Sequence, residues 1–519
     1  MTGSSLVSAS RANPMLRGAR VRLNNGKIID VAAGTLFPSG TSLILENGRI
    51  SALPQPDQNH GSRDSDSDFI VNLHGKTVIP ALFNTHAHLQ RVLPSLLGGF
   101  DVPAAFRRKE EQLRMNLSEC LMRGITHVRD AALFGFPLQS NRRFSDTAGS
   151  CPRIVQSVVV EPPDAYFTQK SSLMPRLAEW GLGFPKIDSE SSESGLVVFP
   201  ADATESQVRD AVDRAVDERG AEAIKVGDQR ENRMTCRPTA RLMNLDQLNA
   251  LADQARRRNI PSTLHHTSVE SFRRGLTAGF HTIAHLPLDL PLTPDDVRQF
   301  SEAGTILEPT LSLAYALAYP FHGTPLEEHP EMDRLGGLRN RTYADFVDQF
   351  WIPPLQESVR SGMKKAIAGG IRIFTKLGLI GPFLHYSRMV STGLTNLRML
   401  ADAGVPLACG NDSGVPPCTP AMAGLELEMA DFFLNSEDEP NRFRPADALR
   451  MATLHSAQAL GKERSFGTLE PGKTADLVVC DGNPLEDFHV LGEPVAALFM
   501  DGRLVLNRCG LVFIPVRPG

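Results

Sequence analysis

The sequence predicts an α/β fold: a (β/α)8 barrel of the TIM type, joined to a small β-sandwich built from both chain ends. Three observations predict it. Between residues 78 and 408, eight apolar segments of strand character alternate with segments of helical character. The chain has 519 residues, which is enough for one large domain and one smaller domain. Short strands joined by turns come before and after this region, so we expect residues 1–78 and 465–519 to form the sandwich and residues 79–464 the barrel.

The composition is that of an ordinary soluble globular protein, with 41% hydrophobic and 22% charged residues. A formal net charge of -5 without a long basic run argues against a general nucleic-acid binder. The closest candidate for a membrane span, residues 366–383, is interrupted by Arg372 and Lys376. Residues 1–20 do not resemble a secretory signal, and seven cysteines without a CxxC spacing favour a reducing compartment. We predict a cytoplasmic protein with a small-molecule substrate, no nucleic-acid partner and no membrane span, and we leave a homo-oligomer open.

The N-terminal region is predicted to consist of short strands at residues 20–23, 27–30 and 41–45. The pair Asn47-Gly48 is the signal of a tight β-hairpin. The Ser- and Asp-rich residues 55–68 that follow are expected to form an exposed loop. This part of the chain therefore leads into the barrel as a small sheet.

The barrel elements follow in alternation. Its strands are expected at residues 78–88, 125–130, 153–160, 223–226, 261–265, 281–285, 306–307 and 405–408. Helices are expected at residues 110–123, 206–219, 245–258 and 269–278. Residues 314–386 are too long for a simple connection, so we expect a lid over the barrel mouth, with a structural excursion far from the site as the alternative. Five aromatic residues either line an apolar pocket there or pack within the lid: Phe321, Phe350, Trp351, Phe383 and Tyr386.

The C-terminal region returns to strand character at residues 475–479, 495–500 and 504–505. Residues 467–474 also match the phosphate-binding pattern GxxxxGK[ST]. That loop requires a helix opening at its lysine, whereas here Pro471 lies inside the loop and a strand is expected to follow. We therefore predict that this end pairs with the N-terminal strands and binds no nucleotide.

The first strand of the barrel ends in His86 and His88. Alternate residues of a strand face the same side, so both imidazoles can point at one spot. Two convergent neutral imidazoles make half of a site for zinc or a related metal. Two ordinary histidines at a strand end are the alternative.

Four further polar residues follow later strands at their carboxyl ends: Lys225, His265, His285 and Asp412. In a barrel these ends meet at one face, where active sites lie. Nitrogen ligands with a carboxylate hold a divalent metal and leave a position for water, whose pKa the metal lowers to roughly 7. An aspartate beside that water can take its proton and pass it to the leaving group.

Lys225 does not fit such a site as a free ammonium, because it would repel the metal. A carbamylated lysine is a carboxylate and is able to bridge two metals. The alternatives for Lys225 are a buried salt bridge and a substrate-carboxylate binder.

These segments together resemble the amidohydrolase superfamily, in the branch of imidazolonepropionase-related proteins and Xaa-Pro or Xaa-Arg dipeptidases. The resemblance extends over nearly the whole chain, through residues 80–88, 124–130, 224–226, 265–285, 404–414 and 467–479. It implies one metal on His86 and His88, and a second metal on His265 and His285. It also implies Lys225 as the carbamylated bridge and Asp412 as a ligand and the general acid/base. The metals it implies are two zinc ions, with manganese, iron or cobalt as alternatives.

The chain departs from the family pattern at three places. Ala81 replaces the usual glycine before the first motif, and Asn84 stands where many members carry aspartate. Residues 227–230 lack the glycine-rich or tyrosine-bearing pattern of better-known members, so substrate contacts do not transfer. The pair His265-His266 leaves two candidates for one ligand, and the spacing to His285 favours His265.

The function that follows is a metal-dependent amidohydrolase, which cleaves an amide-type C–N bond by metal-activated hydroxide. The substrate would be a dipeptide, an N-acyl amino acid or a cyclic amide. An ester, lactone or organophosphate hydrolase needs the same machinery. Less favoured are an aromatic deaminase, because residues 265–268 lack the glutamate expected after its histidine, and a non-catalytic scaffold.

Overall fold

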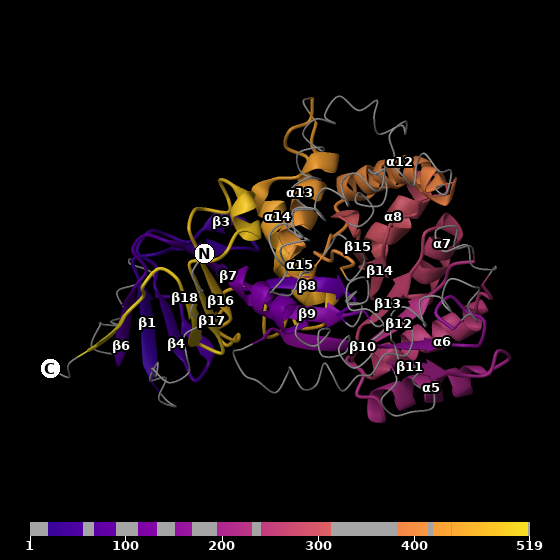
Figure 1. Ribbon diagram of the computed structural model, residues 1–519, viewed down its shortest axis with the longest axis horizontal. Helices are drawn as coiled ribbons and strands as arrows, with labels where there is room; N and C mark the ends of the chain where they lie inside the picture. Colours follow the sequence, from indigo (N-terminus) through magenta and orange to yellow (C-terminus); the bar gives the residue numbers. More distant parts are fainter. Residues whose placement is uncertain are drawn as a thin grey trace, which may run out of the picture.

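A computed structural model describes residues 19–54, 67–89, 113–131, 151–168, 195–230, 240–312, 381–413, 419–436 and 438–516 (Figure 1). For residues 381–391 it describes the backbone alone. The predicted lid of residues 314–386 and its aromatic side chains lie outside this part of the chain, except for the backbone that opens α12 (Gly381–Asp402).

A parallel sheet curls around the centre of the molecule. Neighbouring strands follow the order β15-β14-β13-β12-β10-β9-β8. Their bounds are β8 (Leu82–Ala87), β9 (Ile125–Asp130), β10 (Arg153–Glu161), β12 (Ala223–Gly227), β13 (Ser262–His265), β14 (Thr282–Ala284) and β15 (Ile306–Glu308). A short strand, β11 (Leu196–Val198), pairs with the end of β10. All seven strands lie where the alternation of apolar segments predicts them.

Residues 407–413 close the barrel in place of an eighth strand. Leu407 pairs in parallel with Leu307 of β15, and Ser413 pairs in parallel with Ala87 of β8. The amide of Thr85 donates to the Cys409 carbonyl at 2.8 Å, which ties the same segment to β8. Residues 405–408, predicted as the eighth strand, form no regular strand and contribute one isolated bridge, at Leu407, while the second bridge, at Ser413, lies beyond them. The TIM-like barrel itself is confirmed.

Helices surround this sheet, with α5 (Glu205–Asp217), α6 (Leu245–Arg257), α7 (Val269–Ala278) and α8 (Pro294–Ala303) on the side away from the terminal sheets (Figure 1). Residues at the ends of these helices determine where each helix begins and ends. Thr204 and Asn244 cap α5 and α6, each in a capping box with the glutamine three residues later. Gly279 ends α7 in the left-handed conformation at φ 75°, which costs little without a Cβ. Residues 113–122 form a further helix, within the predicted 110–123.

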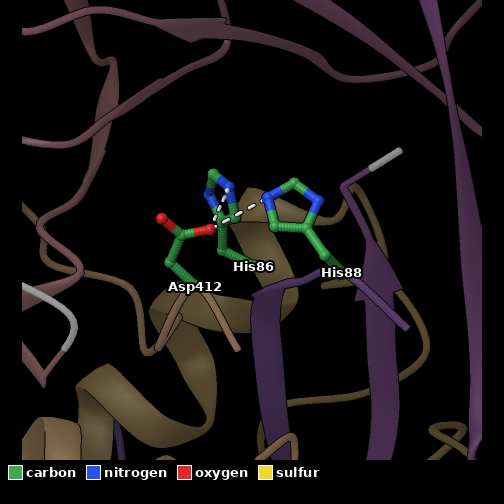
Figure 2. Close-up of side chains that lie close together, drawn as sticks. All are labelled: His86, His88 and Asp412. Carbon is green, nitrogen blue, oxygen red and sulfur yellow. Dashed lines mark ion pairs between the residues drawn. The ribbon is translucent and has the colours of Figure 1, made fainter. Parts of the chain in front are cut away.

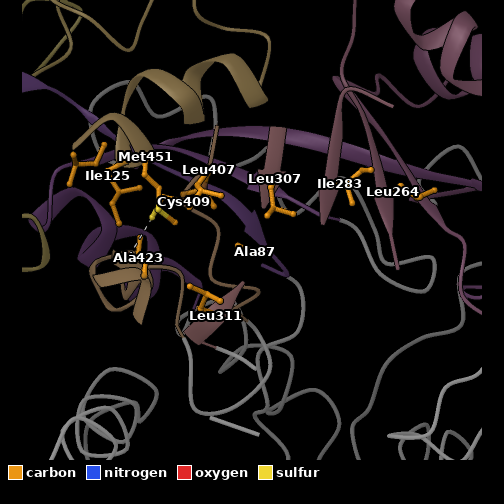
Figure 3. Close-up of a cluster of buried hydrophobic side chains, with 14 of the residues drawn as sticks. Ala87, Ile125, Leu264, Ile283, Leu307, Leu311, Leu407, Cys409, Ala423 and Met451 are labelled. Carbon is orange, nitrogen blue, oxygen red and sulfur yellow. Dashed lines mark hydrogen bonds between the residues drawn. The ribbon is translucent and has the colours of Figure 1, made fainter. Parts of the chain in front are cut away.

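Successive side chains of the barrel strands point to opposite sides of the sheet. One set packs against the surrounding helices, and the other set faces the barrel interior. Leu264, Ile283 and Leu307 face outward and belong to the large apolar cluster that the helices cover (Figure 3). Ile224 of β12 belongs to the same cluster. Their neighbours along the strands, such as Lys225, face the barrel interior. This follows from the two-residue period of a strand.

Helices that the sequence patterns did not predict complete the barrel after the closing segment: α13 (Ala423–Leu434), α14 (Pro445–Ala452) and α15 (Leu454–Ala459). The helix α13 carries apolar side chains on nearly every face, and most of its residues are buried. Without an apolar stripe at helical spacing, such a helix is hard to recognise from its sequence.

Two sheets combine strands from both chain ends (Figure 1). One has the order β18-β17-β16-β7-β2-β3, and the other β19-β6-β1-β4-β5. The N-terminal members are β1 (Arg20–Asn24), β2 (Lys27–Asp30), β3 (Thr35–Leu36), β4 (Leu43–Glu46), β5 (Arg49–Ala52), β6 (Phe69–Asn72) and β7 (Thr77–Pro80). The C-terminal members are β16 (Leu477–Cys480), β17 (Ala497–Met500), β18 (Arg503–Asn507) and β19 (Phe513–Pro515).

One buried apolar cluster joins the two sheets, with Leu23 and Leu45 from one sheet and Leu477 and Phe499 from the other. This shared core supports the predicted sandwich of both termini. Only Ala81 separates β7 from β8, so the chain passes directly from the terminal sheet into the barrel. The division at residues 78 and 465 stays a prediction.

Tight turns join two antiparallel strand pairs in these sheets. Asn47 and Gly48 have φ values of 50° and 78° between β4 and β5, as the hairpin signal predicts. Asp501 and Gly502 form a similar turn between β17 and β18, with φ values of 48° and 70°. Among the described residues, no helix is both long and apolar enough to cross a membrane.

Candidate metal centre at the carboxyl ends of the barrel strands

The barrel brings all six predicted site residues to one region. His86 is next to last in β8, Lys225 lies in β12, and His265 ends β13. His285 follows β14 directly and His88 follows β8 directly. Asp412 lies within the closing segment, one residue before the bridge of Ser413 to Ala87. The carboxyl ends of parallel strands meet at one face of a barrel, and this explains the convergence.

The tightest group consists of His86, His88 and Asp412, whose potential ligand atoms all lie within 4.8 Å of one another (Figure 2). Oδ1 of Asp412 lies 2.9 Å from Nε2 of His88 and 3.6 Å from Nε2 of His86. All three residues are buried. Two imidazole nitrogens and a carboxylate oxygen around one point are a suitable donor set for a zinc-type cation.

Lys225 lies against this group. Its Nζ is 3.1 Å from Nε2 of His86. In the described part of the chain, no carboxylate lies within ion-pair distance of this amine, which disfavours the simple buried salt bridge. Burial, and then the charge of Arg129, lower the pKa of Lys225 to about 7, so a large share of the amine is neutral near neutral pH.

His265 and His285 form a second group beside the first. Their ring centroids are 4.6 Å apart, and the His285 ring lies 5.3 Å from that of His86. Nε2 of His265 lies 2.9 Å from Oε1 of Gln229, and Nδ1 of His285 lies 2.7 Å from Oγ1 of Thr310. These two histidines are neighbours of the His86–His88–Asp412 group and not members of it.

His266 points elsewhere. Its Nδ1 lies 3.2 Å from the Ser268 carbonyl oxygen, and its ring packs against Phe272. Adjacent residues at a strand end face opposite sides, as expected. His265 packs against the His285 ring, and its choice over His266 as the ligand stays a prediction.

Electrostatics suit the group to a cation. Burial lowers the pKa of His86 and His265, and lowers that of His285 to about 4, so these imidazoles are neutral and their nitrogen lone pairs are available. Burial alone would raise the pKa of Asp412. The hydrogen bond from His88 and nearby positive charge outweigh this effect and lower the pKa, so the carboxylate is ionised.

Backbone conformation helps to aim these groups. His285, Thr310 and Asp412 have φ values of 74°, 51° and 48°, a left-handed region that residues other than glycine seldom adopt. Hydrogen bonds hold two of them there. The amide of His285 donates to the Glu308 carbonyl and that of Asp412 to the His86 carbonyl, each at 2.8 Å.

Asn84 explains one departure from the family pattern. Its amide nitrogen donates to Oδ1 of Asn411 at 2.8 Å and to the Pro420 carbonyl at 2.9 Å. An aspartate carboxylate cannot donate either bond. Asparagine therefore ties β8 to the closing segment beside Asp412.

Three polar groups near the centre were not singled out as site residues from the sequence: Glu308, Glu161 and Thr310. Glu308 ends β15, is fully buried and lies 3.2 Å from Nδ1 of His86. Glu161 ends β10 and accepts hydrogen bonds from the amides of Phe167 and Gly227. A lone carboxylate at the end of an apolar strand is the signal that could have identified both glutamates.

Known proteins resemble this chain in sequence. The model of the amidohydrolase family matches residues 77–505. Imidazolonepropionase of Geobacillus kaustophilus (strain HTA426) is 30% identical over 190 residues, which are 36% of this chain and 43% of that protein. A 5-methylthioadenosine/S-adenosylhomocysteine deaminase of Moorella thermoacetica is 34% identical over 130 residues, 23% of this chain and 30% of that protein. The chain thus spans less than half the length of these curated relatives.

Solved structures share the fold over nearly the whole chain. An ochratoxinase of A. niger has a TM-score of 0.65 at 17% identity and covers 95% of this chain and 97% of its own. A Xaa-Pro dipeptidase with bound methionine has a TM-score of 0.62 at 19% identity, covering 94% of this chain and 99% of its own. At such identities the likeness shows the fold alone.

Proposed function

Because its residues 77–505 match the family model, the chain belongs to the amidohydrolase family, and we propose that it is a metal-dependent hydrolase of amide-type C–N bonds. The observation that carries this proposal is the convergence of His86, His88 and Asp412. The substrate class that we propose is a dipeptide, an N-acyl amino acid or a cyclic amide. The relative named imidazolonepropionase supports this class.

The donor sets suggest how two metal ions would be held. His86 and His88 would bind one ion, His265 and His285 the other, and a carbamylated Lys225 would bridge them. Zinc suits these nitrogen and carboxylate donors, and manganese, iron and cobalt are alternatives. When bound, such ions supply Lewis-acid polarisation of the scissile carbonyl and an acidified water.

Asp412 is the proposed general acid/base. Its carboxylate is ionised beside Nε2 of His88, so it can accept the proton of the attacking water. The same carboxyl group would then deliver this proton to the leaving nitrogen. The backbone bond from Asp412 to the His86 carbonyl keeps the carboxyl group at the centre during both transfers.

Carbamylation of Lys225 is supported by its surroundings. The amine is buried against His86, and a neutral amine is the form that reacts with carbon dioxide. The resulting carboxylate would replace a cation that repels metal with an anion that binds it.

The experiment that tests the proposal is metal content per chain, measured on protein purified without chelator and with bicarbonate present. About two equivalents are expected from the two donor sets. About one equivalent would remove Lys225 from the bridge and reopen deamination. Absence of metal, without activity on added zinc or manganese, would overturn the hydrolase and leave a scaffold.

A matched pair of variants tests whether His265 or His266 is the metal ligand at the end of β13. His265→Asn is expected to lose one metal equivalent and hydrolysis of a screened dipeptide, N-acyl amino acid or cyclic amide. His266→Asn, which changes the adjacent buried histidine, is expected to retain both. The reverse result would show that the ligand was assigned to the wrong histidine.

Two other activities stay alternatives. Esters, lactones and organophosphates need the same site, so the substrate screen includes them. A deaminase is favoured by relatives such as the Moorella thermoacetica protein, and release of ammonia from aromatic amidines would identify it. The cytoplasmic location and a homo-oligomer stay predictions.

A further inference from the structure

A buried carboxylate stands behind the proposed metal centre. Glu308 is the last residue of β15 and is fully buried. Its Oε2 lies 3.2 Å from Nδ1 of His86. The same oxygen accepts a hydrogen bond from Nη2 of Arg129.

Arg129 holds this carboxylate from across the barrel. Its guanidinium is fully buried, and its Nη1 donates to Oγ1 of Thr263 at 2.7 Å. That hydroxyl in turn contacts the hydroxyl of Thr282. Strands β9, β13, β14 and β15 are thus joined through the barrel interior, so the position of Glu308 is determined by several strands.

The contact with Glu308 determines which nitrogen of His86 carries the proton. A carboxylate oxygen is an acceptor, so Nδ1 must be the protonated nitrogen if it is to donate. Nε2 then keeps its lone pair, and it is Nε2 that lies nearest to Asp412 and Lys225, at 3.6 Å and 3.1 Å. A histidine whose second nitrogen is held in this way is oriented for metal binding.

We propose that Glu308, held by Arg129, is a positioning residue that keeps His86 in the Nδ1–H tautomer with Nε2 directed into the metal centre. This inference rests on the proposed function in one respect, the presence of a metal. The tautomer itself exists without a metal and can be measured in its absence.

The competing explanation is that the ion pair only stabilises the barrel. A buried ion pair replaced by apolar side chains of similar size often leaves stability unchanged, whereas removal of one partner exposes the other as an uncompensated charge. The double variant Arg129→Met/Glu308→Leu therefore separates the two roles. It removes the acceptor of His86 without leaving an unpaired charge.

The first measurement is the nitrogen-15 spectrum of histidine-labelled, metal-free full-length protein, with the His86 signals identified by their loss in His86→Asn. Wild-type His86 is expected as the Nδ1–H tautomer. In the double variant a population protonated at Nε2 is expected to appear. Protonation of the wild type at Nε2, or an unchanged tautomer in the double variant, would overturn the proposal.

The second measurement is zinc affinity by competition with a chromophoric chelator. The dissociation constant is expected to rise about 10- to 100-fold in the double variant, the usual effect of losing an outer hydrogen-bond partner. Asp476→Asn is the control, because this buried aspartate precedes β16 and pairs with Arg153, which lies at the amino end of β10 and not at the carboxyl end where the site lies. Its zinc affinity is expected to stay at the wild-type value.

The outcomes are distinguishable. Wild-type affinity in the double variant would overturn the positioning role and leave the metal centre standing. Failure of the wild type to bind zinc or manganese would overturn the proposed function, while the tautomer measurement would still decide the role of Glu308. If the double variant does not fold, Glu308→Gln takes its place in both measurements, because its neutral amide oxygen accepts a weaker hydrogen bond from Nδ1 of His86 than the carboxylate oxygen does.

Discussion

At the scale of single residues, the site depends on which atom donates and which accepts. Lys225, His86 and Asn84 are all buried. Among the described residues Lys225 has no carboxylate within ion-pair distance, whereas His86 lies between Glu308 and Asp412. Asn84 lies between two acceptors. Burial makes an unmatched donor or acceptor costly, since water cannot replace the missing partner. Small chemical changes at these positions are therefore expected to have large effects.

Asn84→Asp tests this directly. The new carboxylate would face Oδ1 of Asn411 and the Pro420 carbonyl, two acceptors to which it cannot donate. The free energy of unfolding is expected to fall by about 3 kcal/mol, the cost of a buried unsatisfied charged group. Urea denaturation measures it. Asn259→Asp is the control on the exposed surface, and an equal loss there would contradict the explanation.

At the scale of elements, the closing segment positions Asp412 although it forms no regular strand. Gly410 lets this segment approach β8, because a Cβ at this position would lie 2.7 Å from Cβ of His86. Helices around the barrel are positioned instead by local signals such as the Thr204 cap. The two kinds of element therefore respond differently to substitution.

Gly410→Ala is expected to push the closing segment from β8 and to displace Asp412 from His86. We expect a loss of stability of about 1–3 kcal/mol, as for other overpacked sites, together with weaker zinc binding. Thermal unfolding and chelator competition measure the two effects. Gly492→Ala is the matched control, since its nearest contact would be 3.6 Å, and it is expected to change neither.

Thr204→Ala removes the side-chain cap of α5, whose hydroxyl accepts from the Gln207 amide at 3.4 Å. Loss of a cap costs about 1 kcal/mol of stability, measurable by chemical denaturation, and zinc affinity should be unchanged. Thr277→Ala removes an exposed hydroxyl within α7 and should be neutral or stabilising. A larger loss at Thr277 than at Thr204 would argue against the capping role.

At the scale of the whole molecule, the proposed metals would link β8, β12, β13, β14 and the closing segment. A ligand that binds only the folded state raises its stability in proportion to occupancy. Chelation is therefore expected to lower the midpoint of thermal unfolding, and zinc to restore it. In His88→Asn the midpoint should respond much less to either treatment. An equal response would place the stabilising metal elsewhere.

The sequence alone determined the order of seven barrel strands and of the helices at residues 113–122, α5, α6 and α7, whereas it did not predict α8. Seven of eight predicted strands coincide with observed strands, because each is a short apolar segment bounded by turns and its character is local. Helices such as α7 could also be predicted, from their apolar stripe and the glycine that ends them. The helices after the closing segment could not be predicted from the sequence. The helix α13, for example, is apolar on nearly every face and is stabilised by the structure around it.

The six candidate ligands were also accessible to sequence reasoning, because strand ends of a parallel barrel meet at one face. Only the tertiary structure showed which residues form hydrogen bonds and ion pairs with these candidate ligands. Glu308 and Arg129 lie 179 residues apart in the sequence, and nothing local indicates that one carboxylate oxygen serves both Arg129 and His86. Hydrogen bonds across a barrel depend on register and closure, which are properties of the assembled sheet and not of any one segment.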